Sequence, residues 1–310
     1  MTFPKRVEIV EVGPRDGLQN EAQILPVEAK AELIEALARA GLARIEAGSF
    51  VSPAASPQME TTREVLQRLG PRSDLRLSVL VPNLRGLSAA LAAGAREIAV
   101  FAAATESFSQ RNINCSIAES LDRFSQVVAE ARRQGVRARG YVSCALGCPY
   151  EGAVAPQQTA AVARELRALG CSEISLGDTI GVGTPFAARA LIDIVARDVG
   201  LENLAVHFHD TYGQALANIF ACLETGVAVI DASVGGLGGC PYAPGASGNV
   251  ATEDVVYMLN GMGVDTGVDL DALLGAGAAV ALRLGRAPES AVARAYASRW
   301  RAMQASEAQA

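Results

Sequence analysis

Short segments rich in apolar and β-branched residues alternate along the chain with longer segments rich in alanine, leucine and arginine. The predicted strands are Val7–Val12, Arg44–Gly48, Leu75–Val81, Glu97–Phe101, Arg137–Cys144, Glu173–Leu176, Leu204–His209 and Val229–Val234. The predicted helices are Val27–Ala40, Pro57–Leu69, Arg85–Ala93, Ile117–Gln134, Pro156–Leu169, Pro185–Val199, Gln214–Glu224 and Ala251–Asn260. Strict alternation, with strands apolar enough to be buried on both faces, predicts a parallel sheet covered by helices.

Eight such units within roughly 260 residues fit a closed α/β barrel of the (β/α)8 TIM type. An open, doubly wound sheet is the alternative, but the turn after the first strand, Gly13–Gly17, lacks the G-x-G-x-x-G spacing of dinucleotide-binding sheets. Several helices are predicted to end at a glycine: Gly41, Gly94, Gly135, Gly170, Gly200 and Gly226. We expect a single catalytic domain over residues 1–310, with a barrel core at about 7–267 and extra C-terminal helices over 268–310.

The composition argues against several classes of function. The net charge is −6 and no basic run occurs, so nucleic acid is not an expected partner. The most apolar stretch, residues 87–104, is interrupted by Arg96 and Glu97, so no membrane-spanning helix is predicted. The first residues contain no apolar leader, and six cysteines are too few for a disulfide framework, which together predict a reducing, cytoplasmic location.

Polar residues gather at the predicted carboxyl ends of the strands, where barrel enzymes carry their chemistry. They are Arg15, Asp16, Glu46, Ser49, Asn83, Cys144, Cys148, Asp178, His207, His209, Asp210, Cys240 and Asn249. The chain has two histidines, and both fall on this rim. Its two lysines, Lys5 and Lys30, lie before the first strand and in the first helix, so a Schiff-base mechanism is not expected.

His207 and His209 are two positions apart on a predicted strand, so their side chains point to the same side. Two imidazoles on one face favour a metal site; a pair of core or surface histidines and a metal-free acid–base pair are the alternatives. Asp16, held in a turn by flanking glycine and proline, is the best further carboxylate ligand, and Asn249 offers a carbonyl oxygen. Mixed nitrogen and oxygen ligands suit Mg²⁺ or Mn²⁺ better than structural zinc.

Cys240 differs from the other cysteines because four of the five residues before it are glycines. A loop of this kind can move or let a ligand approach the backbone, so Cys240 is a candidate catalytic thiol, the alternative being a loop cysteine without a role. A zinc–thiolate site is not expected, because Cys144 and Cys148 do not have C-x-x-C spacing and no second pair exists.

Three charged residues allow both a structural and a functional interpretation. Arg15 either pairs with Asp16 or binds an anionic or carbonyl group of a substrate. Asp178 is either a helix cap or an active-site carboxylate. Glu46 is a charge within an apolar strand, which is costly unless Arg15 or a metal-bound water pairs with it.

Six segments, in the same order, resemble hydroxymethylglutaryl-CoA lyases. They are Val10–Glu21 (VEVGPRDGLQNE), Ser49–Pro53 (SFVSP), Gly147–Gly152 (GCPYEG), Ser175–Gly181 (SLGDTIG), His207–Gln214 (HFHDTYGQ) and Gly238–Tyr242 (GGCPY). The resemblance runs from about Val7 to Gly267 and implies a barrel enzyme that uses a divalent cation, Mg²⁺ or Mn²⁺. The wider superfamily of metal-dependent barrel lyases and synthases shares only the Arg15-Asp16 turn and the His-x-His strand.

The resemblance also implies roles for individual residues. The implied metal ligands are Asp16, His207, His209 and Asn249. The implied catalytic residues are Arg15, which would stabilise an enolate, Cys240, which would act as an acid, and Asp16, Glu46, Asp178 and His207. The expected substrate contacts are Arg15, Ser49, Asn83 and Ser143.

The implied reaction is cleavage of (S)-3-hydroxy-3-methylglutaryl-CoA to acetoacetate and acetyl-CoA, as in leucine degradation. The expected partners are this small acyl-CoA substrate and, because barrel enzymes often dimerise, a second copy of the chain in a homodimer. One alternative is a lyase for a longer-branched 3-hydroxyglutaryl-CoA. Another is a transferase that condenses an acyl-CoA with a 2-oxo acid on the same barrel, which predicts a further C-terminal domain. A non-catalytic barrel is the third, and the presence of every candidate ligand argues against it.

Overall fold

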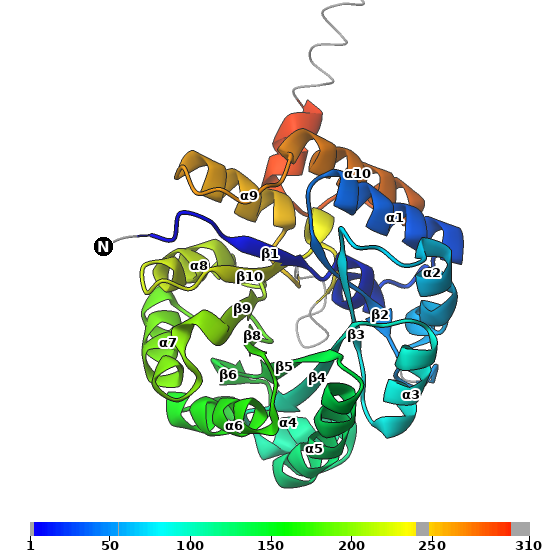
Figure 1. The fold of residues 1–310 in the computed structure, drawn as a ribbon. Helices are drawn as coiled ribbons and strands as arrows, with labels where there is room; N and C mark the ends of the chain where they lie inside the picture. Colours follow the sequence, from blue (N-terminus) through cyan, green and yellow to red (C-terminus); the bar gives the residue numbers. More distant parts are fainter. Residues whose placement is uncertain (1–2, 55, 240–247, 299–310) are drawn as a thin grey trace, which may run out of the picture.

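Eight parallel strands close into a barrel, so the predicted fold class is confirmed. The computed structural model describes residues 3–54, 56–239 and 248–298. The strands follow one another around the barrel in the order β1-β10-β9-β8-β5-β4-β3-β2 (Figure 1). Their bounds are β1 (Glu8–Glu11), β2 (Arg44–Ser49), β3 (Arg76–Leu80), β4 (Glu97–Ala103), β5 (Arg137–Ser143), β8 (Glu173–Asp178), β9 (Leu204–Phe208) and β10 (Val229–Ala232).

Helices surround the strands, and the eight helices predicted with bounds lie close to their predicted positions (Figure 1). Their bounds are α1 (Val27–Arg39), α2 (Thr62–Leu69), α3 (Leu84–Ala92), α4 (Glu106–Ile113), α5 (Ile117–Arg133), α6 (Pro156–Leu169), α7 (Pro185–Val199), α8 (Ala215–Leu223), α9 (Thr252–Gly261) and α10 (Leu270–Arg283). The six glycines predicted to end helices all have φ between 70° and 110°, which a side chain would disfavour.

A short helix and a hairpin were not predicted, and both lie in loops on the carboxyl side of the barrel strands. Helix α4 follows β4, and a hairpin of β6 (Gly147–Cys148) and β7 (Gly152–Ala153) follows β5. Helix α4 has eight residues and buries only Phe108 and Ser109, so its sequence carries little helical periodicity. The predicted helix Pro57–Leu69 is also divided, because a 3₁₀ turn over Pro57–Met59 precedes α2.

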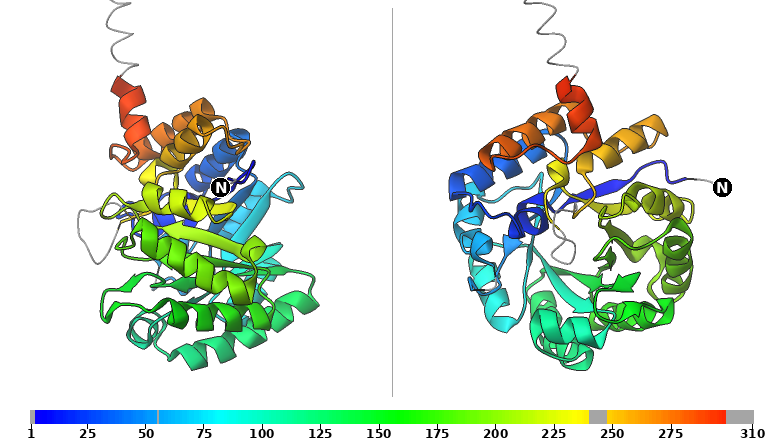
Figure 2. Two further views of the ribbon diagram at one scale, coloured as in Figure 1. Left: turned by 90° about the vertical axis from the view of Figure 1, so that its left-hand side faces the viewer. Right: turned by 180° about the vertical axis from the view of Figure 1, so that it is seen from behind.

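The C-terminal helices pack on the barrel. Leu273, Ala276 and Val280 of α10 belong to the same hydrophobic core as the strands. Arg283 forms an ion pair with Glu32 of α1 at 2.5 Å. Residues 291–298 form a further helical segment near α10, drawn in red in the two views of Figure 2. That the chain is one catalytic domain with a boundary at about residue 267 stays a prediction.

The lower part of the barrel interior is filled by ion pairs as well as by apolar side chains. Arg139 of β5 bonds Glu173 of β8 and Asp231 of β10, each at 2.6 Å. Arg44 of β2 bonds the same Glu173 at 2.9 Å and Glu8 of β1 at 2.9 Å. These contacts form one continuous network that joins the strands through the interior. Each buried charge in it is paired and hydrogen-bonded, which is the condition under which a buried charge is tolerated.

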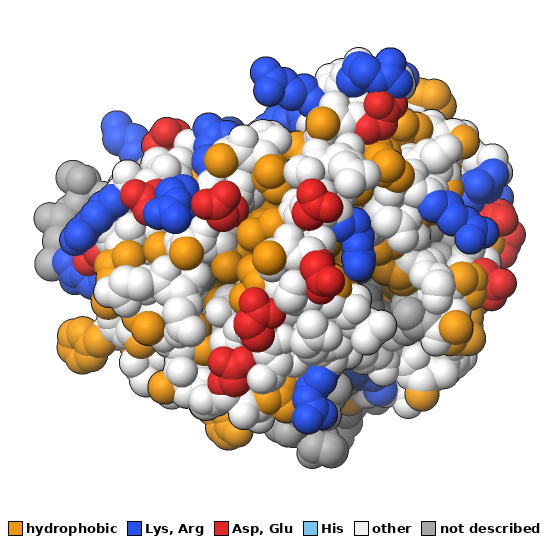
Figure 3. All heavy atoms as spheres, turned by 90° about the horizontal axis from the view of Figure 1, so that it is seen from below, with side chains coloured by type: hydrophobic (Ala, Val, Ile, Leu, Met, Phe, Trp, Pro, Cys, Tyr) orange, Lys and Arg blue, Asp and Glu red, His pale blue; other side chains and the backbone are white. Residues whose placement is uncertain are grey.

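Figure 3 draws one face of the surface. Acidic and basic side chains are interspersed there, with apolar patches between them. No helix within the described part of the chain is both long and apolar enough to cross a membrane.

Candidate active site

The two histidines and Asp16 meet at the carboxyl end of the barrel strands. His207 lies on β9 and His209 directly after it, and their ring centroids are 5.5 Å apart. Asp16 lies in the π-helical turn η1 (Gly13–Gly17) after β1. One ligand atom from each of the three side chains lies within 4.8 Å of the others. The spacing of the histidines therefore does put both imidazoles at one point, together with a carboxylate from another strand end.

Asn249 borders this cluster. It forms an isolated antiparallel bridge with His209, and its Nδ2 donates to Oδ2 of Asp16 at 2.9 Å. An amide carries one oxygen and one NH2 group, so metal ligation by Asn249 requires that its oxygen face the cluster instead. Its place as a fourth ligand stays a prediction.

The charges of the cluster suit a cation. Burial disfavours the ionised form of Asp16, but Arg15 and the two imidazoles outweigh it and hold the pKa of the Asp16 carboxyl well below its usual range. Burial lowers the pKa of His209 to about 4, so its imidazole is neutral at pH 7. The Nδ1 atom of His209 is buried and has no hydrogen-bond partner among the described residues. An anionic carboxylate and a neutral imidazole are the forms that bind metals.

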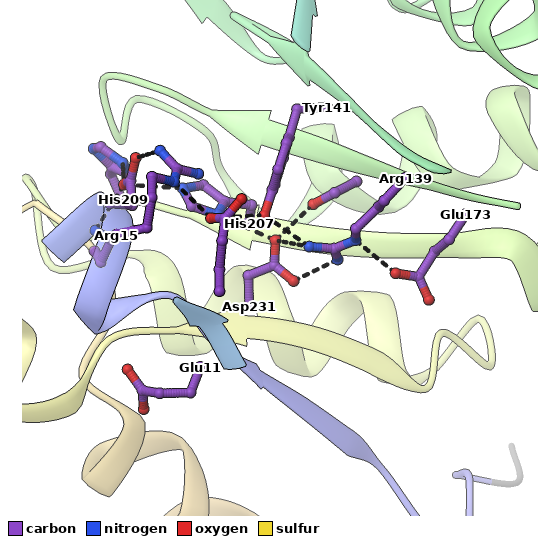
Figure 4. A network of polar contacts seen from close by, with 12 residues as sticks. Glu11, Arg15, Arg139, Tyr141, Glu173, His207, His209 and Asp231 are labelled. Atoms are coloured by element: carbon purple, nitrogen blue, oxygen red, sulfur yellow. Dashed lines mark hydrogen bonds and ion pairs between the residues drawn. The ribbon is translucent and has the colours of Figure 1, made fainter. Parts of the chain in front are cut away.

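Asp231, which was not among the predicted site residues, orients His207. Its Oδ2 lies 3.2 Å from Nδ1 of His207 and accepts from Ser175 at 2.8 Å, while Arg139 holds both carboxylate oxygens. With Nδ1 bonded to a carboxylate, Nε2 of His207 faces Asp16 at 3.7 Å. Figure 4 shows this succession from His209 and Arg15 through His207 and Asp231 to Arg139 and Glu173. Asp231 is a charge within an apolar strand, the same signal that singled out Glu46.

Arg15 is held between two carboxylates. Its Nε donates to Oε2 of Glu46 at 2.6 Å, and its Nη1 donates to Oδ1 of Asp16. The Tyr141 hydroxyl also donates to Oε2 of Glu46, at 3.3 Å. Arg15 therefore pairs with Asp16, and among the described residues these bonds use its Nε and Nη1 and leave Nη2 for another partner. Its role in binding a substrate stays a prediction. Glu46 contacts Arg15 and Tyr141 and lies away from the open mouth of the barrel. It is fully buried, and burial raises its pKa.

A cavity of about 510 Å³ opens above the cluster. Its polar wall includes Arg15, Asp16, Asn83, Ser143, His207 and His209. Its apolar wall includes Val51, Leu80, Phe101, Phe108 and Ile113. Asp16 is the single carboxylate among the described residues that line this cavity. A larger cavity, of about 690 Å³, opens at the amino-terminal end of the barrel beside α2 and contains none of the predicted site residues.

The remaining predicted residues lie in three different places. Asn83 lines the cavity and also caps α3, since its side chain accepts from the backbone N–H of Gly86. Ser49 is buried, and Val51 and Ser52 line the cavity after it. Cys240 lies outside the described residues.

Asp178 stabilises a loop in the structure. Its carboxylate accepts from the backbone N–H groups of Val182 and Gly183, at 3.2 and 2.8 Å, and burial raises its pKa to about 6. These contacts favour the structural interpretation of Asp178 over the catalytic one, which stays a prediction.

Comparison with known proteins decides the family. Residues 6–280 match the family model described as HMGL-like. The chain belongs to the HMGL-like family. It is therefore an enzyme of the hydroxymethylglutaryl-CoA lyase kind, as the six sequence segments implied.

Close relatives of this family match nearly the whole chain. A Pseudomonas aeruginosa protein named 3-hydroxy-3-isohexenylglutaryl-CoA/hydroxy-methylglutaryl-CoA lyase is 58% identical, over 95% of this chain and 98% of its own length. The mitochondrial hydroxymethylglutaryl-CoA lyase of Bos taurus is 56% identical, over 95% of this chain and 90% of its own length. The crystal structure of hydroxymethylglutaryl-CoA lyase from Pseudomonas aeruginosa has a TM-score of 0.95 and 57% identity, over 96% of this chain and 100% of that one.

Proposed function

We propose that this chain cleaves (S)-3-hydroxy-3-methylglutaryl-CoA to acetoacetate and acetyl-CoA. The observation that carries the proposal is the Asp16, His207 and His209 cluster at the base of a cavity whose wall also holds Arg15. Membership of the HMGL-like family and the names of the close relatives support the same substrate.

The described residues fit a divalent cation. Asp16, His207 and His209 would hold it, because their ligand atoms converge and the carboxylate is anionic beside a neutral His209. A cation bound there supplies Lewis-acid polarisation of the tertiary hydroxyl of the substrate. Its oxygen and nitrogen ligands favour Mg²⁺ or Mn²⁺. Asp231 would fix His207 for this task, as carboxylates behind metal-binding histidines do.

The side chains of this site can accept the hydroxyl proton of the substrate and stabilise the negative charge of the enolate. The base that accepts the hydroxyl proton is Asp16, the cavity carboxylate, or a histidine of the cluster acting through a water. The O–H electrons then form the new ketone as the C2–C3 bond of the glutaryl chain breaks. The electrons of that bond pass into the thioester, whose enolate oxygen is held by the Arg15 guanidinium. Glu46 and Tyr141 keep Arg15 in place.

Cys240 is the proposed acid that returns a proton to the enolate carbon. Gly239, the residue before it, lines the cavity. A thiol with an ordinary pKa of about 8.5 is mostly protonated at pH 7 and can donate. We expect Cys240→Ser to lose most of kcat while Mn²⁺ affinity, measured by titration calorimetry, stays unchanged. A kcat close to that of the parent would remove Cys240 from the mechanism.

The acyl preference is tested by product analysis. The longer-branched 3-hydroxyglutaryl-CoA alternative is kept because Val51, Leu80 and Phe101 offer an apolar wall and because one relative is named for both substrates. Incubation with hydroxymethylglutaryl-CoA is expected to give acetoacetate and acetyl-CoA in equal amounts. Parallel reactions with the isohexenyl substrate measure the preference through kcat/KM. An absence of carbon–carbon bond cleavage with both substrates, in the presence of Mn²⁺, would refute the proposed function.

We further propose a homodimer that acts in the cytoplasm in leucine degradation. The family is consistent with this pathway, and the acyl-CoA substrate follows from the relatives' names.

A further inference from the structure

Two buried carboxylates that the reaction steps do not use bond the backbone of the turns that follow β1 and β10. Glu11 is the last residue of β1, and Glu253 lies in the first turn of α9. Neither is exposed to solvent. Figure 4 draws Glu11 apart from the residues around His207. A buried carboxylate is costly unless it is bonded, so the contacts of these two residues require an explanation.

Glu11 joins two turns of the barrel rim through a single oxygen. Its Oε1 accepts from the backbone N–H of Gly13 at 2.8 Å and from that of Val234 at 2.9 Å. Gly13 begins η1, the turn that carries Arg15 and Asp16, and Val234 begins the 3₁₀ turn η4 (Val234–Gly236) after β10. The other oxygen, Oε2, accepts from the Thr252 hydroxyl at 2.7 Å.

Glu253 makes a similar contact with the residue after Val234. Its Oε2 accepts from the backbone N–H of Gly235 at 2.8 Å. The two turns are also packed without free space, because a Cβ on Gly17 would lie 2.5 Å from Oγ of Ser233. Beyond η4, the carbonyl of Leu237 accepts from Nδ2 of Asn249 at 3.3 Å. A displacement of η4 relative to η1 would therefore move Asn249 relative to Asp16.

We propose that Glu11 is a positioning residue of the metal site, which fixes the turn carrying Arg15 and Asp16 against the segment that contacts Asn249. The inference rests on the proposed metal-dependent function. Glu11 touches neither the cavity nor the cluster, and it acts through the backbone of the two turns.

To hold the two turns together, Glu11 needs its acceptor oxygens more than its negative charge. Burial raises the pKa of Glu11 to about 7, so the protonated form is well populated near neutral pH. A glutamine can place its oxygen at the two backbone N–H groups and donate its NH2 group to the Thr252 hydroxyl, which also accepts. An aspartate keeps the charge but withdraws both oxygens by one methylene group.

The test measures Mn²⁺ affinity by titration calorimetry without substrate, on full-length protein freed of metal. We expect Glu11→Asp to weaken Mn²⁺ binding by about tenfold or more, as loss of partners behind metal ligands does. We expect Glu11→Gln to stay within about threefold of the parent. The matched control is Glu97→Asp, which shortens a buried carboxylate at the amino-terminal end of the barrel and is expected to leave Mn²⁺ affinity unchanged. Thermal unfolding of each variant shows separately how far stability falls.

Unchanged Mn²⁺ affinity in folded Glu11→Asp, or a loss in Glu11→Gln equal to that in Glu11→Asp, would overturn the inference. Equal losses in Glu11→Asp and Glu97→Asp would also overturn it, because the effect would then be one of general stability. A parent that binds Mn²⁺ without cleaving hydroxymethylglutaryl-CoA contradicts the proposed function and leaves the role of Glu11 standing. A parent that binds no Mn²⁺ overturns both.

Discussion

Replacing His209 with alanine is expected to abolish Mn²⁺ binding and to reduce cleavage to that of protein treated with EDTA. His209 supplies one of three converging ligand groups, and its neutral imidazole is buried beside Asp16. The chain has no other histidine than His207, so no imidazole can replace it. Mn²⁺ binding is measured by electron paramagnetic resonance, and cleavage by release of acetyl-CoA from hydroxymethylglutaryl-CoA.

EDTA treatment of the parent provides the companion measurement. Activity is expected to vanish in chelator and to return when Mg²⁺ or Mn²⁺ is added in excess. Tyr212→Phe, a change in an exposed aromatic residue three positions after His209, is the control and is expected to bind Mn²⁺ as the parent does. Full activity in chelator, or parent-like Mn²⁺ binding by His209→Ala, would contradict the metal site.

Replacing Arg15 with methionine is expected to lower kcat by about 10²–10³-fold, or roughly 3–4 kcal/mol of transition-state stabilisation. The guanidinium lines the cavity, and its Nη2 is left free of the bonds to Glu46 and Asp16. Methionine keeps much of the side-chain volume while removing the positive charge that faces the enolate oxygen. The measurement is kcat at saturating substrate and Mn²⁺, and a change below tenfold would count against the role.

This substitution also leaves Glu46 buried without its cation, which by itself destabilises a protein by about 3–5 kcal/mol. The double variant Arg15→Met/Glu46→Gln separates the two effects, because it removes both charges. If Arg15 acts on the enolate, kcat stays low in the double variant while the unfolding midpoint recovers. Recovery of kcat to within tenfold of the parent would assign the loss to the unpaired Glu46.

The barrel itself could be predicted because its signals are local. Alternation between short apolar strands and amphipathic helices, with glycine at the helix ends, is set by neighbouring residues, and all eight strands were found. Helix α4 and the hairpin β6–β7 were missed because they are short and bury few residues. Short elements depend on the packing around them more than on their own periodicity.

Much of the candidate metal cluster follows from the sequence alone. The two-residue periodicity of a strand puts His207 and His209 on one face, and the barrel topology brings Asp16 to the same rim. The resemblance of six segments to hydroxymethylglutaryl-CoA lyases predicted the family, and the comparisons with known proteins confirmed it. None of these steps needed knowledge of side-chain contacts.

Which charged residues support the cluster depends on contacts that exist only in the folded barrel. Asp231 lies 24 positions from His207, and Glu11 lies more than 200 positions from Val234, yet each pair is hydrogen-bonded. The structure likewise showed Asp178 bonded to its own loop and Glu46 buried beneath the cavity. Contacts between strands depend on barrel closure and register, and the periodicity within one strand predicts neither of them.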